Sequence, residues 1–275
     1  MKRSGIAAGE PGRYTFLFCL LVIRIANEQL ILSKSNCKRK EKKMNSPKKT
    51  ARVAGFLYLI IFCLAIFAEL FVRQSLIVPG DAAETANNIM ASEGLFRSGI
   101  VIFLIEQTVF LLLPLVLYKL LNSVNKNHAI LMVIFVLVGI PIACINELNQ
   151  FAVLLLMSGA DYLTAFEADQ LHTQVMLFLD LYEHGIFIAK IFWGLWLFPL
   201  GYLVFKSGFL PRILGVLLIM ACFGYLIDFF TFFLFPNFDV AINMYTGWAE
   251  LLLCLWLLIK GVNVEQWEKR ALESA

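Results

Sequence analysis

Charged side chains are scarce in this sequence, and the short motifs that mark soluble enzymes are missing. Only 16% of the 275 residues are charged, whereas 60% are hydrophobic, and the mean hydropathy is +0.78. This composition excludes an ordinary soluble domain, whose surface must carry more polar residues. The chain contains no Walker loop, G-x-G-x-x-G, G-x-S-x-G or H-E-x-x-H motif. No motif therefore indicates a reaction, no cofactor is expected, and the sequence favours a role other than catalysis.

Two further features are missing. No stretch combines clustered Lys and Arg with interleaved aromatic residues, so nucleic-acid binding is not expected. Four of the six cysteines lie inside apolar stretches and two precede them, which gives no disulfide framework in the connecting segments. The cysteines are therefore interpreted as packing residues or bystanders.

What the sequence does contain is six apolar stretches of about 20 residues, each long enough to cross a bilayer core of roughly 30 Å as a helix. The predicted spans are residues 53–72, 99–121, 129–157, 179–205, 213–235 and 245–262. We therefore predict an all-α integral membrane protein, a six-helix transmembrane bundle whose main partner is the lipid bilayer.

Basic residues alternate from one connection to the next, which predicts the orientation. Ten of the 13 Lys and Arg residues that follow Met44 fall on one side, including the KSGFLPR connection. The other side holds only Arg73 and Arg97, together with several acidic residues. A multi-pass inner-membrane protein with both ends in the cytoplasm is predicted. Its first outer connection contains Asp81 and Glu84 in the D-x-x-E pattern that opens a helix.

The N-terminal region fits this topology poorly. Residues 14–32 are apolar but include Arg24, and a span there would place the following KSNCKRKEKK on the outer side, against the charge rule. Residues 1–43 are therefore interpreted as an extension ahead of a true start at Met44, with an interfacial helix on the inner leaflet as the alternative. A six-span domain, residues 44–265, and a short cytoplasmic tail, residues 266–275, would follow.

Ionisable residues occur at the depth of the spans, where a charge is costly and often marks a function or an internal pair. In the predicted topology they converge on the outer half of the bundle. Asp180, Glu183 and His184 share one helix face, because they stand at i, i+3 and i+4. The predicted outward-facing polar pocket is lined by Glu106, Glu147, Asp180, Glu183, His184, Lys190, Asp228 and Glu250.

Three interpretations of this cluster remain open. The groups can be structural, paired internally or, as for Glu69, placed at the headgroup boundary, which would make the chain a non-catalytic structural or accessory protein. They can bind or transport a small cationic or polar solute or ion. They can also form a metal-dependent intramembrane hydrolase, in which Asp180 and His184 would hold the metal. The oligomeric state is left open.

Several segments resemble a known family. The stretches ARVAGFLYLIIF, LIVPGDAAETANNI and LFRSGI, followed by the long segment from LFLDLYEHG through GFLPRILG to GYLID, are similar to bacterial integral membrane proteins grouped as a domain of unknown function with the GFLPRILG signature. The resemblance covers roughly residues 51–236 and excludes the first 43. It implies a multi-pass membrane protein and transfers no activity and no catalytic residues.

Overall fold

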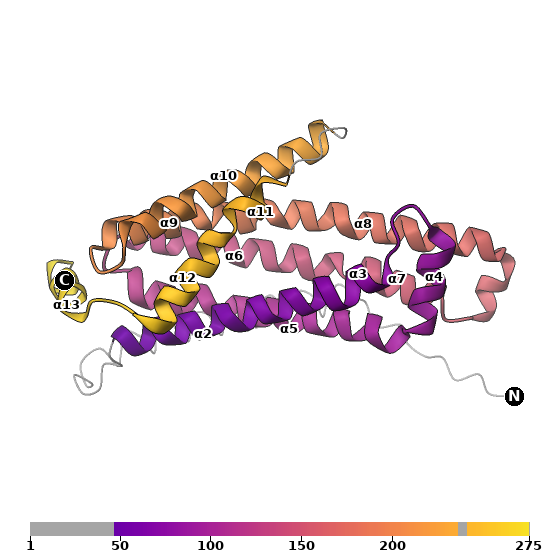
Figure 1. The fold of residues 1–275 in the computed structure, drawn as a ribbon, viewed down its shortest axis with the longest axis horizontal. Helices are drawn as coiled ribbons and strands as arrows, with labels where there is room; N and C mark the ends of the chain where they lie inside the picture. The colour runs from indigo at the N-terminus through magenta and orange to yellow at the C-terminus, as the bar shows by residue number, and fades with distance from the viewer. Residues whose placement is uncertain (1–46, 236–240, 275) are drawn as a thin grey trace, which may run out of the picture. The chain divides into compact units, whose positions relative to one another are not determined.

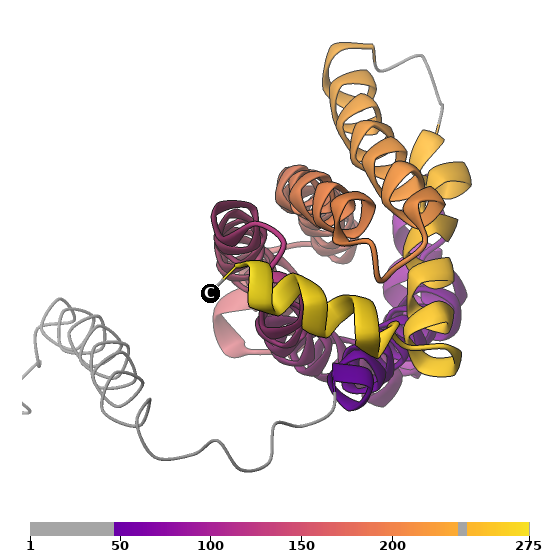
Figure 2. The same cartoon turned by 90° about the vertical axis from the view of Figure 1, so that its left-hand side faces the viewer.

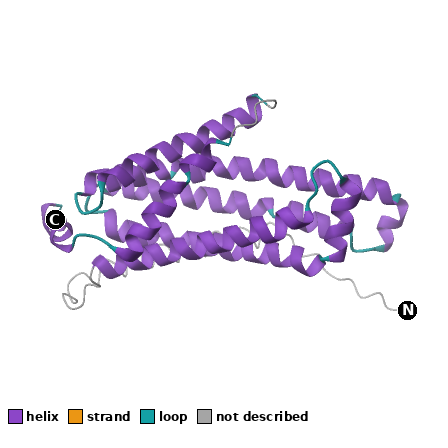
Figure 3. Cartoon of the chain, viewed as in Figure 1, coloured by secondary structure: helices purple, strands orange, loops and turns teal. Residues whose placement is uncertain are grey.

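The computed structural model describes residues 47–235 and 241–274, and this part of the chain is helical without strands (Figure 3). Six helical stretches in it are long and apolar enough to cross a membrane, as predicted. The first span comprises α2 (Pro47–Ile66), η2 (Phe67–Arg73) and α3 (Gln74–Leu76), and the second is α5 (Glu93–Leu121). The third comprises α6 (Lys126–Asn146) and α7 (Leu148–Leu156), and the fourth comprises α8 (Ala168–Leu195) and α9 (Leu197–Ser207). The fifth is α10 (Arg212–Leu234), and the sixth comprises α11 (Ile242–Thr246) and α12 (Trp248–Ile259). The proposed extension, residues 1–43, and Met44 lie outside the described residues.

Apolar side chains on the outward faces of the spans show what surrounds them. Val101, Leu112 and Ile134 are 55%, 47% and 46% exposed, although each lies in the middle part of its span. Such a surface is unfavourable in water and favourable against lipid chains. The chain is therefore a multi-pass membrane protein.

The six spans form a ring in chain order. Each span packs against the next, and α12 of the sixth span returns to pack against α2 of the first. Close helix approach is achieved with small residues, as is common in membranes. A Cβ atom on Gly201 of α9 would lie only 2.7 Å from the carbonyl oxygen of Gly215 in α10. Each of these two glycines therefore lets the neighbouring backbone come close.

The GFLPRILG segment makes the tight turn between α9 and α10. Gly208 ends α9 with a φ of 75°, a left-handed conformation that favours glycine. The Leu210 amide donates to Ser207 Oγ at 3.2 Å, and Pro211 precedes the first residue of α10. The signature thus encodes a turn and, through Gly215, a close helix contact.

One end of the bundle holds this turn, the start of α2 and the C-terminal helix α13 (Val264–Glu273). We call it the basic end, because the ten Lys and Arg residues of the predicted cytoplasmic side flank the spans there. Figure 2 faces this end and shows α13 crossing it. The Trp267 indole donates to the Leu120 carbonyl at 2.9 Å, which fixes α13 to the end of α5. The start of the first span and the end of the sixth thus share one end, while the cytoplasmic assignment of that end stays a prediction.

The opposite end carries the short helix α4 (Ala82–Ala91) and the 3₁₀ turn η3 (Asp161–Ala165). Asp81 caps α4, since its carboxylate accepts from the Glu84 amide at 2.8 Å. This is the helix start that the D-x-x-E pattern predicted. We call this the α4 end.

The interior differs between the two ends. The largest core cluster lies toward the basic end and is built from side chains such as Leu117, Leu200 and Leu257. Tyr58, Phe110 and Trp196 form an aromatic layer within it, with ring centroids 5.4 Å apart for Phe110 and Trp196 and 6.0 Å for Tyr58 and Trp196. Toward the α4 end, a smaller core cluster that includes Ile89, Phe96 and Leu179 lies beside a partly open cavity.

Candidate functional site

A cavity of about 370 Å³ lies among the first four spans. Its wall is mostly apolar and includes Phe96, Phe103, Phe187 and Trp193. No described residue of α10, α11 or α12 lines it. The polar side chains that line it are Glu69, Arg73, Glu106, Gln150, Tyr182, Glu183 and Lys190. An apolar cavity of this size with a few convergent polar groups has the usual composition of a small-molecule site.

The first span changes helix type where it borders the cavity. Phe67–Arg73 form a π-helical segment, η2, which carries both Glu69 and Arg73. π-Helical segments are rare, and they occur frequently at functional sites. The wider turn changes the directions of the side chains within it. Here the segment places Arg73 beside the fourth span.

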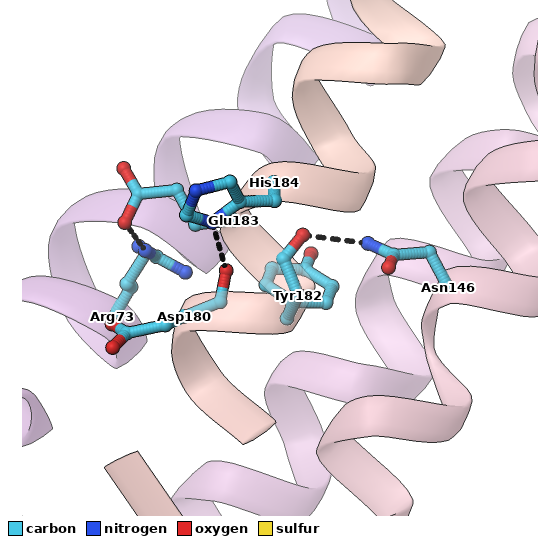
Figure 4. A network of polar contacts seen from close by, with 6 residues as sticks. All are labelled: Arg73, Asn146, Asp180, Tyr182, Glu183 and His184. Atoms are coloured by element: carbon cyan, nitrogen blue, oxygen red, sulfur yellow. Dashed lines mark hydrogen bonds and ion pairs between the residues drawn. The ribbon is translucent and has the colours of Figure 1, made fainter. Parts of the chain in front are cut away.

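Arg73 joins the first span to the fourth through an ion pair. Its guanidinium donates to Glu183 Oε2 at 3.2 Å, and the side chains of Arg73 and Glu183 are 26% and 49% exposed (Figure 4). The guanidinium carbon also lies 5.7 Å from the centre of the Tyr182 ring. We call Arg73 and Glu183 the outer pair; each compensates the charge of the other.

Glu106 and Lys190 lie farther from the α4 end. Both α5 and α8 run from that end toward the basic end, and Lys190 follows Glu183 by about two helical turns. The Lys190 ammonium lies 4.2 Å from the centre of the Phe187 ring, a cation–π contact. Within residues 47–235 and 241–274, neither Glu106 nor Lys190 takes part in an ion pair. We call these two residues the inner charges.

The fourth span is held against the third by a hydrogen bond behind the cavity wall. Asn146 Nδ2 donates to the Tyr182 carbonyl oxygen at 2.7 Å (Figure 4). Gly185 makes room for this contact, because a Cβ atom there would overlap the Asn146 side chain. Tyr182, which lines the cavity, is thereby held in place.

Asp180 and His184, the predicted metal ligands, are both exposed and do not line the cavity. His184 Nδ1 lies 2.7 Å from the backbone carbonyl oxygen of Asp180, so this contact does not use the Asp180 carboxylate (Figure 4). The imidazole packs edge-on against Phe232. Among the described residues, no group of three or more His, Cys, Asp and Glu side chains lies close enough to hold a metal ion.

The remaining predicted residues are engaged elsewhere. Asp228 is 5% exposed and accepts from the amides of Ile242 and Asn243 at 2.6 and 2.8 Å, so it caps the start of the sixth span. Glu250 accepts from the hydroxyl groups of Tyr58 and Tyr225, each at 3.4 Å.

Glu147 lies between α6 and α7, is 1% exposed, and accepts from the Gln150 amide at 3.1 Å. Glu250 was predicted in the outer half, but its partner Tyr58 lies in the first half of the span Pro47–Leu76, which is the half nearer the basic end.

The structure thus brings three of the eight predicted pocket residues to one cavity, namely Glu106, Glu183 and Lys190. It adds Arg73, which the sequence showed only as one of two basic residues near the outer connections. A signal for Arg73 was available, since it stands four residues after Glu69 and hence on the same side of a helix. That these residues bind a ligand stays a prediction.

Comparison with known proteins agrees with the resemblance read from the sequence. Residues 53–261 match the family model described as a domain of unknown function (DUF4386). The chain is also similar to an uncharacterized protein of Archaeoglobus fulgidus, with 36% identity over 152 residues, which are 54% of this chain and 75% of that protein. No solved structure matches. The chain therefore belongs to the DUF4386 family of membrane proteins.

Proposed function

We propose that this membrane protein binds a small polar or cationic solute in the cavity among its first four spans. The observation that carries the proposal is Glu106, a half-buried carboxylate that lines the cavity and has no ionic partner among the described residues. A carboxylate away from water is costly unless a cation or hydrogen-bond donors compensate it. A bound ammonium group would supply both the charge and the donors.

The cavity wall suits a solute with an apolar part. Phe103, Phe187 and Trp193 border the same space as Glu106. Aromatic faces attract cations, and the carboxylate adds a charge-assisted hydrogen bond. An organic cation is therefore favoured over a hydrated metal ion, which would need more oxygen ligands.

We propose binding rather than transport as the function of the cavity. Transport needs a route to both sides, whereas the aromatic layer of Tyr58, Phe110 and Trp196 fills the bundle beyond the cavity. Transport would thus require a second conformation in which this layer opens. No contact of Asp180 or His184 favours the metal-dependent hydrolase, so the binding function is the one we retain.

Isothermal titration of the purified protein in nanodiscs tests the proposal. The probe is 2-phenylethylammonium, and its neutral analogue 2-phenylethanol serves as the comparison. We expect the ammonium to bind at least about tenfold more tightly, because a hydrogen bond to a charged group contributes about 1.5–3 kcal/mol. Glu106→Gln should remove this preference.

The matched control is Glu84→Gln, which changes an exposed glutamate in α4 outside the cavity. It should leave the preference intact. Equal affinity for the ammonium and the alcohol, or a preference that survives Glu106→Gln in a well-folded variant, would rule the proposal out.

A further inference from the structure

We infer that the solute is a zwitterion whose ammonium group binds Glu106 and whose anionic group binds Lys190. This inference rests on the proposed binding function and deepens it, because it specifies the charges of the solute. Its basis is that the two inner charges have opposite sign, line the same cavity and do not pair with each other.

The inner charges come from different walls. Glu106 belongs to α5 and Lys190 to α8, two different spans that line the cavity, and the rings of Phe103 of α5 and Tyr182 of α8 are 6.4 Å apart at its wall. A ligand in the cavity would therefore meet a carboxylate from one span and an ammonium from another. A molecule with two opposite charges matches this arrangement.

Glu106 and Lys190 are the half-buried charges at the cavity that have no ion pair among the described residues. Arg73 and Glu183 form the outer pair, whereas Glu69 is exposed. A ligand that carried only a positive charge would satisfy Glu106 and leave the Lys190 ammonium without an ion pair. A purely anionic ligand would leave Glu106 without one, whereas a zwitterion gives each inner charge an ion pair.

The apolar wall adds a further requirement. Ile186, Phe187 and Trp193 lie on the same stretch of α8 as Lys190, and all three line the cavity. They favour a zwitterion with an apolar substituent, because burial of an apolar group contributes about 25 cal/mol per Å². Two sources share this chemistry: a free amino acid with an apolar side chain, and an aminophospholipid, whose headgroup carries an ammonium and a phosphate.

Three matched probes test the inference by titration in phosphatidylglycerol nanodiscs. L-Phenylalanine carries both charges, 2-phenylethylammonium only the positive charge, and phenylacetate only the negative charge. We expect phenylalanine to bind about tenfold more tightly than either analogue, because each analogue leaves one inner charge uncompensated.

Lys190→Met should abolish the advantage of phenylalanine over the amine, while the binding of the amine itself is not weakened. Met is only one atom shorter than Lys and fills most of the same space without the charge, and Lys190→Arg should restore part of the advantage. Lys119→Met, at the end of α5 near the basic end, is the matched control and should change nothing.

Phosphatidylethanolamine distinguishes between the two candidate ligands, a free amino acid and an aminophospholipid headgroup. If the headgroup is the natural ligand, nanodiscs containing this lipid should weaken phenylalanine binding by competition. Native mass spectrometry should then show retained phosphatidylethanolamine that Lys190→Met releases. The inference is overturned if neither phenylalanine affinity nor lipid retention depends on Lys190. The proposed function is kept after that result if Glu106→Gln still weakens the binding of 2-phenylethylammonium. If 2-phenylethylammonium does not bind at all, the proposed function is itself wrong.

Discussion

On the side of the bundle formed by α10, α11 and α12, Asp228 and Glu250 each accept two hydrogen bonds from the protein. At the cavity among the first four spans, Glu106 of α5 and Lys190 of α8 have no ionic partner among the described residues. Backbone amides donate to Asp228 and tyrosine hydroxyl groups donate to Glu250. Each carboxylate on this side is therefore part of a structural hydrogen-bond network. The second side leaves opposite charges available beside a cavity.

The difference shows why a polar residue at the depth of a span is ambiguous in sequence. Burial of a charge requires compensation, but the compensating group can belong to the protein or to a ligand. Asp228 and Glu106 both stand within apolar helices, and only their surroundings separate the two roles. Variants of each residue therefore test whether the two carboxylates have different roles.

The largest effect is expected for Asp228→Ala. It leaves the partly buried amides of Ile242 and Asn243 without their acceptor and removes a buried carboxylate, which should lower the free energy of unfolding by about 2–4 kcal/mol. Thermal and denaturant unfolding in detergent micelles measure this loss. Asp161→Ala, at an exposed position in η3, is the control. An unchanged stability of Asp228→Ala would mean that this side of the bundle does not depend on the cap.

A smaller loss is expected for Gly185→Ala, at the contact between the third and fourth spans. The added methyl group would displace the Asn146 side chain and break its bond to the Tyr182 carbonyl, at a cost of about 1–3 kcal/mol in the free energy of unfolding. The same unfolding assays apply. Gly94→Ala in α5 meets no atom within 4 Å and should be neutral or stabilising by up to about 1 kcal/mol. Equal effects of the two substitutions would contradict the close contact at Gly185.

The smallest change in stability is expected for Glu106→Gln. Because the structure gives this carboxylate no ionic partner, its neutralisation should leave the free energy of unfolding unchanged or raise it by up to about 1 kcal/mol. Unfolding is measured without added ligand. A loss comparable with that of Asp228→Ala would show that Glu106 has a structural partner and would remove the contrast between the two sides.

Features that depend on local sequence could be predicted. Long apolar runs predict the six spans, because a bilayer requires helices of a minimum length, and Asp81 predicts the start of α4, because a cap needs only nearby amides. The stretches that include the GFLPRILG segment were together sufficient to indicate the family. None of these predictions needs to know which helices are neighbours.

The candidate site was only partly accessible from sequence, because it depends on how the helices are rotated. The depth of Glu106, Glu183 and Lys190 predicted a polar region, and these residues do line one cavity. Depth alone could not show that Asp228 turns toward the amides of the sixth span or that Arg73 reaches Glu183. Those contacts are set by tertiary packing and by the change of helix type in η2.

The π-helical segment Phe67–Arg73 also affects how single-residue deletions should act on this protein. A π turn holds about one residue more than an α-helical turn, so removal of one residue there can return the segment to regular α-helix while the helix on either side keeps nearly its orientation. The same deletion in the regular helix α2 would rotate everything after it by about 100° and turn Arg73 away from Glu183. The first span should therefore tolerate the loss of one residue within Phe67–Arg73 better than the loss of one residue within α2.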